Sequence, residues 1–173
     1  MRVRTIIDRV LEWLMIVLMI ILLVDVLWQV VSRYLNRLLV NHIGIQIPAE
    51  SYSFTDELAG FLLIWVALLG AAYATGKKQH LAIDLLASKL NDSGKVILTR
   101  IINVLILIFS SGVMIVGGVW LVYTRFYLGQ ISPSMEVPIG FVYLVVPVSG
   151  ILINYYAIAD FFECKRMINK YLN

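Results

Sequence analysis

The chain has 173 residues, of which 61% are apolar and only 14% are charged, and its mean hydropathy is +0.88. Soluble domains are typically about 45–50% apolar and about 25% charged, so this composition excludes an ordinary water-soluble domain. The segments between the apolar stretches are too short to form a core of their own, which also excludes a separate soluble catalytic or nucleotide-binding domain.

Four apolar stretches have the length of membrane-spanning helices, because roughly 20 helical residues cross a hydrocarbon core about 30 Å thick. The first, 13–32, contains one acid, Asp25, and the other three, 58–76, 101–124 and 137–159, contain no Asp, Glu, Lys or Arg. The first stretch is too long for the apolar region of a signal peptide, so we expect a retained helix. The sequence therefore predicts a single all-α membrane domain over residues 1–173, with spans at about 10–34, 56–76, 98–124 and 137–162.

The positions of the basic residues predict the orientation, because Lys and Arg in short loops are retained on the cytoplasmic side. If both termini are cytoplasmic, eleven of the fourteen basic residues lie inside, and only Arg33, Arg37 and Arg125 lie outside. We therefore expect cytoplasmic N- and C-termini. The net charge of +3 follows from this topology and requires no nucleic acid as a partner.

The first span carries a polar stripe. Asp25, Gln29, Ser32 and Arg33 share one helix face at spacings of four, seven and eight residues. Asp25 lies about 18 Å along the helix from Trp13, at ~1.5 Å per residue, which places it nearer the outer leaflet than the midplane. The stripe is interpreted either as hydrogen bonding between helices of this chain or as a docking site for a second membrane protein or an ion path.

The segment before the second span ends in Ser53-Phe-Thr-Asp56-Glu57. A Ser or Thr followed by two acids is typical of a helix N-terminus, where free N–H groups favour carboxylates. The second helix alone can therefore account for Asp56 and Glu57. A further role in binding a partner stays open.

An amphipathic helix is predicted at about residues 80–91, between the second and third spans. His80, Asp84, Ser88 and Asn91 fall on one face and apolar residues fall on the other. Such a helix suits the cytoplasmic membrane interface, where it contacts lipid, but its apolar face can equally pack on another protein.

Small and helix-bending residues mark the expected packing faces of the later spans. The small residues let another helix approach closely, and they are Ala67, Gly70, Ala71, Ala74, Ser110, Ser111, Gly117, Gly118 and Gly150. Pro147 removes a helical hydrogen bond and predicts a bend, while Pro138 suits the first turn of the fourth helix.

The motifs of several catalytic classes are missing from the sequence. The two histidines, His42 and His80, lie outside the predicted spans and cannot be paired haem ligands there. There is no Gly-rich phosphate loop, no Cys/His metal cluster and no Ser-His-Asp set. We therefore expect neither an enzyme nor a cofactor bound by this chain. The matching broken helices of a complete transporter are also missing, so the chain is interpreted as part of a transport machine.

Several motifs together resemble a known family. They are Ser32-Arg33-Tyr34, Thr55-Asp56-Glu57-Leu-Ala, Trp65-Val-Ala-Leu-Leu-Gly70, His80-Leu-Ala-Ile-Asp84, and a later block that includes Pro138 and Pro147. In order and spacing they are similar to the small membrane subunit, of the DctQ or SiaQ type, of tripartite ATP-independent periplasmic (TRAP) transporters. The resemblance covers roughly residues 10–160. The segment after Tyr34 is longer here than in most of the family.

This resemblance implies a scaffold in the bacterial inner membrane. In such systems a periplasmic binding protein captures an organic acid, such as sialic acid or a C4-dicarboxylate, and a large membrane subunit moves it with sodium by an elevator motion. The small subunit associates with the large one, and sodium is expected in the large subunit. The candidate interface or structural residues are Asp25, Arg33, Asp56, Glu57, Trp65, Gly70, His80, Asp84, Pro138 and Pro147.

Two other functions remain open from the residues alone. A small self-sufficient four-helix transporter could couple to protons through Asp25, the lone acid within a span. An assembly factor for another membrane complex would bind a large partner without transport.

Overall fold

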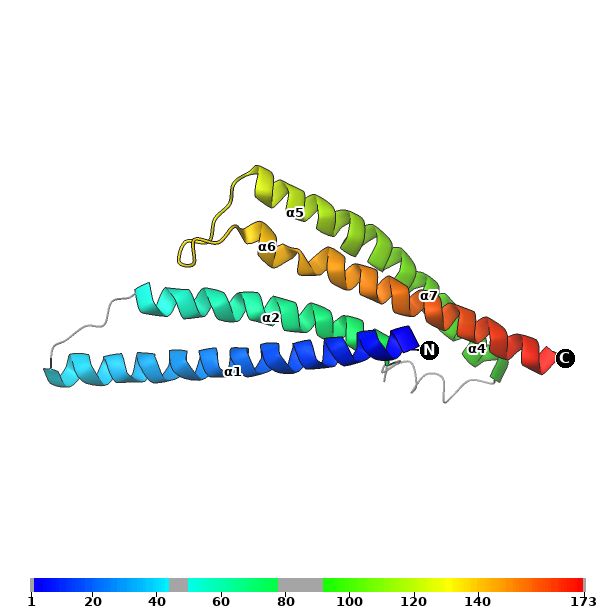
Figure 1. Cartoon of the computed structure of the whole chain (residues 1–173), viewed down its shortest axis with the longest axis horizontal. Coiled ribbons are helices and arrows are strands. Elements are labelled where there is room, and N and C mark those ends of the chain that lie inside the picture. Colours follow the sequence, from blue (N-terminus) through cyan, green and yellow to red (C-terminus); the bar gives the residue numbers. More distant parts are fainter. Residues whose placement is uncertain (1, 44–49, 78–91, 173) are drawn as a thin grey trace. The chain divides into compact units, whose positions relative to one another are not determined.

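The structure, a computed structural model, describes residues 2–43, 50–77 and 92–172 (Figure 1). The named elements within these residues are helices, accompanied by one isolated bridge between Ile131 and Pro138. Four helical segments are long and apolar enough to cross a membrane: Arg4–Leu39, Ser53–Gly76, Ile97–Tyr127 and Ile139–Ala159. The all-helical, four-span prediction is thus confirmed. The predicted amphipathic helix, with His80 and Asp84, lies outside the described residues.

The chain divides into two compact units. One consists of Met1–Ala67 with Tyr123–Val142, and the other of Leu68–Val122 with Tyr143–Asn173. Helix α2 (Glu50–Gly76) and helix α5 (Gly118–Tyr127) each run from one unit into the other. Contacts are therefore described below within each unit.

Helix α1 (Arg2–Ile43) has 42 residues, which corresponds to about 63 Å at ~1.5 Å per residue. It continues well past the predicted end near residue 34. The sequence after Ser32 contains Arg33 and Arg37, which ended the apolar stretch, but it has no Gly or Pro before Gly44. Hydropathy indicates which residues lie in the membrane and not which residues are helical. The prediction from hydropathy therefore omitted the polar last turns of α1.

Helix α2 begins at Glu50, several residues before the predicted start. Ser53 and Thr55 lie inside this helix, and Asp56 and Glu57 lie beyond its first turn. The interpretation of these two acids as N-terminal capping charges is therefore wrong, because the unpaired N–H groups of a helix are confined to its first four residues. Their partners lie on other elements, as described below.

The third span contains a wide turn that the sequence pattern did not predict. Helix α4 (Asp92–Phe109) continues into a π-helix, η1 (Ser110–Gly117), and then into α5. Ser110, Met114 and Gly118 are buried at a spacing of four residues. The π-helix thus keeps these three small or flexible residues on the side that meets α7 (Val145–Leu172).

The fourth span is interrupted at Leu144, between helix α6 (Ile139–Tyr143) and α7. Pro147 lies three residues after the break. It has no N–H to donate to the carbonyl of Tyr143, and its ring crowds that carbonyl. The expected irregularity is therefore present, one turn before the proline. Pro138 directly precedes α6, and its carbonyl accepts a hydrogen bond from the N–H of Phe141 at 3.1 Å.

Close packing dominates the second unit. Ala72, Met114 and Ile153 form a buried apolar cluster. The hydroxyl of Ser110 donates to the carbonyl of Gly150 at 2.7 Å. A Cβ on Gly150 would lie only 2.8 Å from the Cβ of Met114, so the glycine permits the backbones of η1 and α7 to approach. The prediction that Ser110, Gly118 and Gly150 form packing faces is confirmed.

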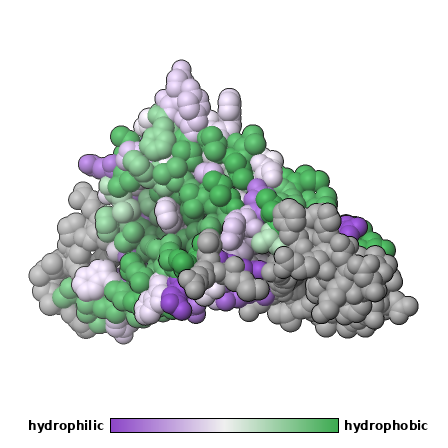
Figure 2. All heavy atoms as spheres, turned by 45° about the vertical axis from the view of Figure 1, so that its right-hand side comes forward, coloured by the Kyte–Doolittle hydropathy of each residue, from purple (hydrophilic) through white to green (hydrophobic). Residues whose placement is uncertain are grey.

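The surface is largely apolar, as Figure 2 shows for one face of the described residues. Large exposed side chains occur along every span, among them Trp13, Leu27, Ile108, Trp120 and Ile151. A water-soluble protein does not display apolar surface on this scale, whereas a lipid-embedded helix bundle does.

Candidate functional site

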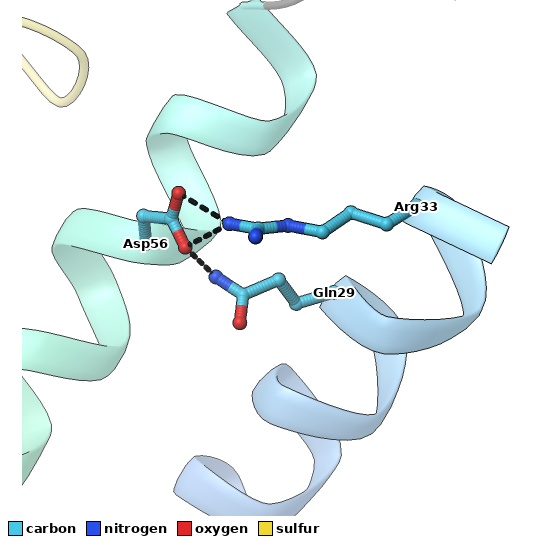
Figure 3. Close-up of polar contacts among 3 residues, drawn as sticks. All are labelled: Gln29, Arg33 and Asp56. Atoms are coloured by element: carbon cyan, nitrogen blue, oxygen red, sulfur yellow. Dashed lines mark hydrogen bonds and ion pairs between the residues drawn. The ribbon is translucent and has the colours of Figure 1, made fainter. Parts of the chain in front are cut away.

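The polar stripe of α1 contacts α2 through one carboxylate. Arg33 Nη2 lies 2.7 Å from both Oδ1 and Oδ2 of Asp56, and Gln29 Nε2 donates to Oδ1 of the same residue (Figure 3). Two positions one turn apart on α1 are therefore joined to a single position on α2. The side chains of Arg33 and Asp56 are each more than half exposed, so the pair orients the two helices more than it stabilises them.

Asp25 lies one turn before Gln29 on the same stripe, and its situation is different. The residue is only 8% exposed, and its Oδ2 atom has no hydrogen-bond partner within the described chain. A buried polar atom without a partner costs free energy, and the cost rises for a charged group inside a membrane. This carboxyl group is therefore the least satisfied polar group of the stripe.

An open apolar groove of about 580 Å³ lies beside Asp25, which forms part of its lining together with Thr55. The other lining residues are Ile20, Ile21, Val24 and Trp28 of α1 and Phe54 and Leu58 of α2. The side chains of Trp28 and Phe54 are 64% and 43% exposed. Two aromatic side chains beside the buried Asp25 can therefore be contacted by whatever occupies the groove.

Glu57 is directed away from this stripe and holds a loop. Its Oε2 atom accepts hydrogen bonds from the hydroxyl of Ser132 and, at 3.2 Å, from the backbone N–H of Ser134. Both donors belong to the 128–138 hairpin, which is closed by backbone hydrogen bonds of 3.0 Å from Ser132 to Val137 and from Ile139 to Gln130. The acid thereby fixes the hairpin to α2.

The remaining predicted residues have structural surroundings. Trp65 Nε1 donates to the carbonyl of Val142 at 3.1 Å, which links α2 to α6. Gly70 lies partly buried in α2. Pro147 is buried, and a Cβ on Gly118 would lie 3.0 Å from its ring. The two residues predicted on the amphipathic helix, His80 and Asp84, lie outside the described residues.

Sequence reasoning missed several residues that organise these contacts. Ser132 is 2% exposed and anchors the hairpin, yet in the sequence it is one polar residue of a loop. Trp28 and Phe54 border the groove, but each reads as an ordinary interfacial aromatic residue. Gly129 and the adjacent Pro133 are local signals of an ordered turn near Ser132, whereas no sequence pattern pairs Trp28 with Phe54.

The described residues contain no group of three or more His, Cys, Asp or Glu side chains able to hold a metal ion. What they do contain is a helix-joining ion pair, an acid-anchored hairpin, and a buried acid beside an open apolar groove. The four apolar helices and these contacts define a multi-spanning helical membrane protein.

Comparison with known proteins identifies the family. The family of tripartite ATP-independent periplasmic transporters, DctQ component, matches residues 22–166. This range covers most of the chain, and the chain therefore belongs to the DctQ family. Its location is the bacterial inner membrane, as a multi-pass protein.

Individual relatives agree with this assignment. A TRAP transporter small permease protein of Haemophilus influenzae is 32% identical over 102 residues, covering 59% of this chain and 62% of the relative. The C4-dicarboxylate TRAP transporter small permease protein DctQ of Rhodobacter capsulatus is 28% identical over 99 residues, or 57% of this chain and 43% of the relative. The isethionate TRAP transporter permease protein DctMQ of Oleidesulfovibrio alaskensis is 26% identical over 117 residues, or 64% of this chain and 18% of the relative.

The aligned regions span less than two thirds of each relative's own length. The family to which this chain belongs is a transporter component, so the expectation that the chain is not an enzyme is confirmed.

Proposed function

We propose that this chain is the static small subunit of a TRAP transporter that takes up an organic acid, such as sialic acid or a C4-dicarboxylate. In this proposal it packs against the large transport subunit and widens the fixed frame against which that subunit moves. A periplasmic binding protein delivers the substrate, and sodium, which drives uptake, binds in the large subunit. The observation that carries the proposal is the family match over residues 22–166.

Two properties of the relatives support the proposed assembly and substrate class. The matched region is only 18% of the isethionate permease protein, so a segment like this chain occurs there within a much longer permease. The named substrates of two relatives, C4-dicarboxylate and isethionate, are both small organic anions. A small organic anion is therefore the substrate class to test first.

The architecture suits a subunit without a transport site of its own. The helices display apolar surface to their surroundings, and the second unit is closely packed around Gly150. The positions of Arg33, in the C-terminal part of α1, and of Arg125, in the last turn of α5, suit the periplasmic side in the proposed topology. The Glu57-anchored hairpin would then face the binding protein.

Reconstituted uptake tests this function directly. The large subunit, with and without this chain, is placed in proteoliposomes, and labelled sialic acid or C4-dicarboxylate is supplied with the binding protein under an inward sodium gradient. We expect substrate accumulation only when both membrane proteins are present. Equal uptake by the large subunit alone would contradict the proposal.

This chain alone, under a proton gradient, is the matched control of the same experiment. Proton-driven transport by it would support a self-sufficient transporter that uses Asp25.

A further inference from the structure

The starting observation is the free oxygen of Asp25. The residue is 8% exposed, and Oδ2 has no hydrogen-bond partner within the described chain. Its neighbour one turn along, Gln29, donates to Asp56 instead. A carboxyl group this deep in a helix pair is costly unless a donor reaches it, so the structure as a single chain leaves this site incomplete.

The groove beside Asp25 restricts what can complete the site. Its walls are apolar apart from Asp25 and Thr55, and Trp28 and Phe54 stand exposed beside them. Acyl chains can fill such a groove, but they carry no hydrogen-bond donor for the carboxyl group of Asp25. The occupant must therefore combine an apolar body with a polar group at the depth of Asp25. In the hydrocarbon region the protein element with these properties is a helix.

Charge decides which polar group the occupant carries. Arg33 is already engaged with Asp56 at 2.7 Å, and no basic residue lines the groove. Asp25 lies on the same face of α1 as Gln29 and Arg33, the two residues that bind Asp56. Two acids thus share one base on this face of the helix pair. A cationic side chain on the occupant would balance the remaining negative charge.

We propose that the α1–α2 groove receives one transmembrane helix of the large subunit, and that a Lys or Arg of this helix binds the carboxyl group of Asp25, which lines the groove. The apolar side chains of that helix lie against Trp28 and Phe54, which provide large aromatic contact area at its edges. This inference rests on the proposed function, because it requires the large subunit, and it names the contact by which the two proteins join.

The first test compares two acids on the same helix. In the co-expressed complex, Asp25→Asn should reduce the large subunit recovered per copy of this chain on the order of tenfold, because a buried cation then loses its counter-charge. Glu12→Gln removes an exposed acid from α1 and should leave recovery unchanged. Full recovery with Asp25→Asn would overturn the inference.

Stability of the isolated chain separates docking from folding. Because Asp25 is unsatisfied in the single chain, Asp25→Asn should leave its melting temperature in detergent unchanged or raise it, while the complex weakens. A merely structural acid would lower the melting temperature and the recovery together, and that result would also overturn the inference.

A second test maps the neighbour by photo-crosslinking, with a matched pair of positions. Val24 lines the groove and is 62% exposed, whereas Val30 is 59% exposed and is not among the lining residues. The two positions are about 120° apart around α1. A photoreactive residue at Val24 should crosslink to one helix of the large subunit, and the same residue at Val30 should not.

The crosslinked helix then provides a rescue experiment. Asp25→Lys should abolish recovery, and exchange of the opposing basic residue for Asp should restore it. Crosslinks from Val24 to lipid alone, or to a second copy of this chain, would overturn the inference while leaving the proposed function intact if the complex is still recovered. Failure to recover any complex with the unaltered chain would instead contradict the proposed function.

Discussion

The contacts among α4, η1 and α7 differ in kind from the contacts between α1 and α2. In the first region the buried hydroxyls of Ser110 and Ser149 donate to carbonyls of the chain itself, and glycine allows the backbones to approach. In the second region the helices are joined by exposed ion-pair partners, and a buried acid lacks a partner beside an open groove. In the first region the chain itself satisfies the buried hydroxyl groups. The second region has the properties of a surface that binds another protein, since a buried acid and an apolar groove there lack partners within the described chain.

The largest expected effect comes from disturbing the complete region. Gly150→Leu would force side-chain atoms into the Cβ of Met114 and the backbone of Ile115. We expect the free energy of unfolding in detergent to fall by about 3 kcal/mol, because overpacking of a close helix contact cannot relax without shifting the backbones. Denaturant titration followed by circular dichroism measures this change.

Gly112→Leu is the matched control, since a Cβ at this π-helical glycine has no neighbour within 4 Å. It should leave the free energy of unfolding unchanged or slightly higher. Equal destabilisation by the two substitutions would contradict the close approach described at Gly150.

An intermediate effect is expected where an acid anchors a loop. Glu57→Gln keeps the shape of the side chain but removes the charge that accepts hydrogen bonds from Ser132 and Ser134. We expect a loss of about 1–2 kcal/mol, the difference between charge-assisted and neutral hydrogen bonds, together with faster proteolytic cleavage in the 128–138 hairpin. Glu136→Gln changes an exposed acid of the same hairpin and should alter neither property.

The smallest effect on the isolated chain is expected at the α1–α2 ion pair. Arg33→Ala should lower the free energy of unfolding in detergent by less than about 1 kcal/mol, because both partners are more than half exposed. Arg37→Ala, one turn further along α1, is exposed and serves as the control in the same denaturant titration. If Arg33→Ala lowered the free energy of unfolding by about 3 kcal/mol or more, the ion pair would be a main source of the chain's stability, which would contradict the account.

The spans and the break in the fourth helix could be predicted from the sequence. Uninterrupted apolar stretches specify membrane helices by length alone, and Pro147 specifies a break through its missing N–H. The long end of α1 and the early start of α2 could not be predicted in this way, because those turns are polar and hydropathy does not detect them. The π-helix could not be predicted either, since no residue pattern in Ser110–Gly117 distinguishes it from an α-helix.

The candidate site was predictable only as a set of separate residues. Asp25, Gln29 and Arg33 were identified as one stripe because they share a helix face, which is a local property. For their partner Asp56, the sequence offers helix capping as an explanation and leaves a role in binding a partner open, but it does not indicate a contact with α1. The contact between Glu57 and Ser132 joins residues 75 positions apart, and no local pattern reports such a pairing.

The most direct test of the central claim is the stoichiometry of the complex in its own membrane. A tagged copy of this chain is extracted in mild detergent, purified, and analysed by quantitative mass spectrometry. The account predicts a large TRAP membrane subunit in about equal molar amount. Recovery of this chain alone, as a monomer or a dimer, would contradict it.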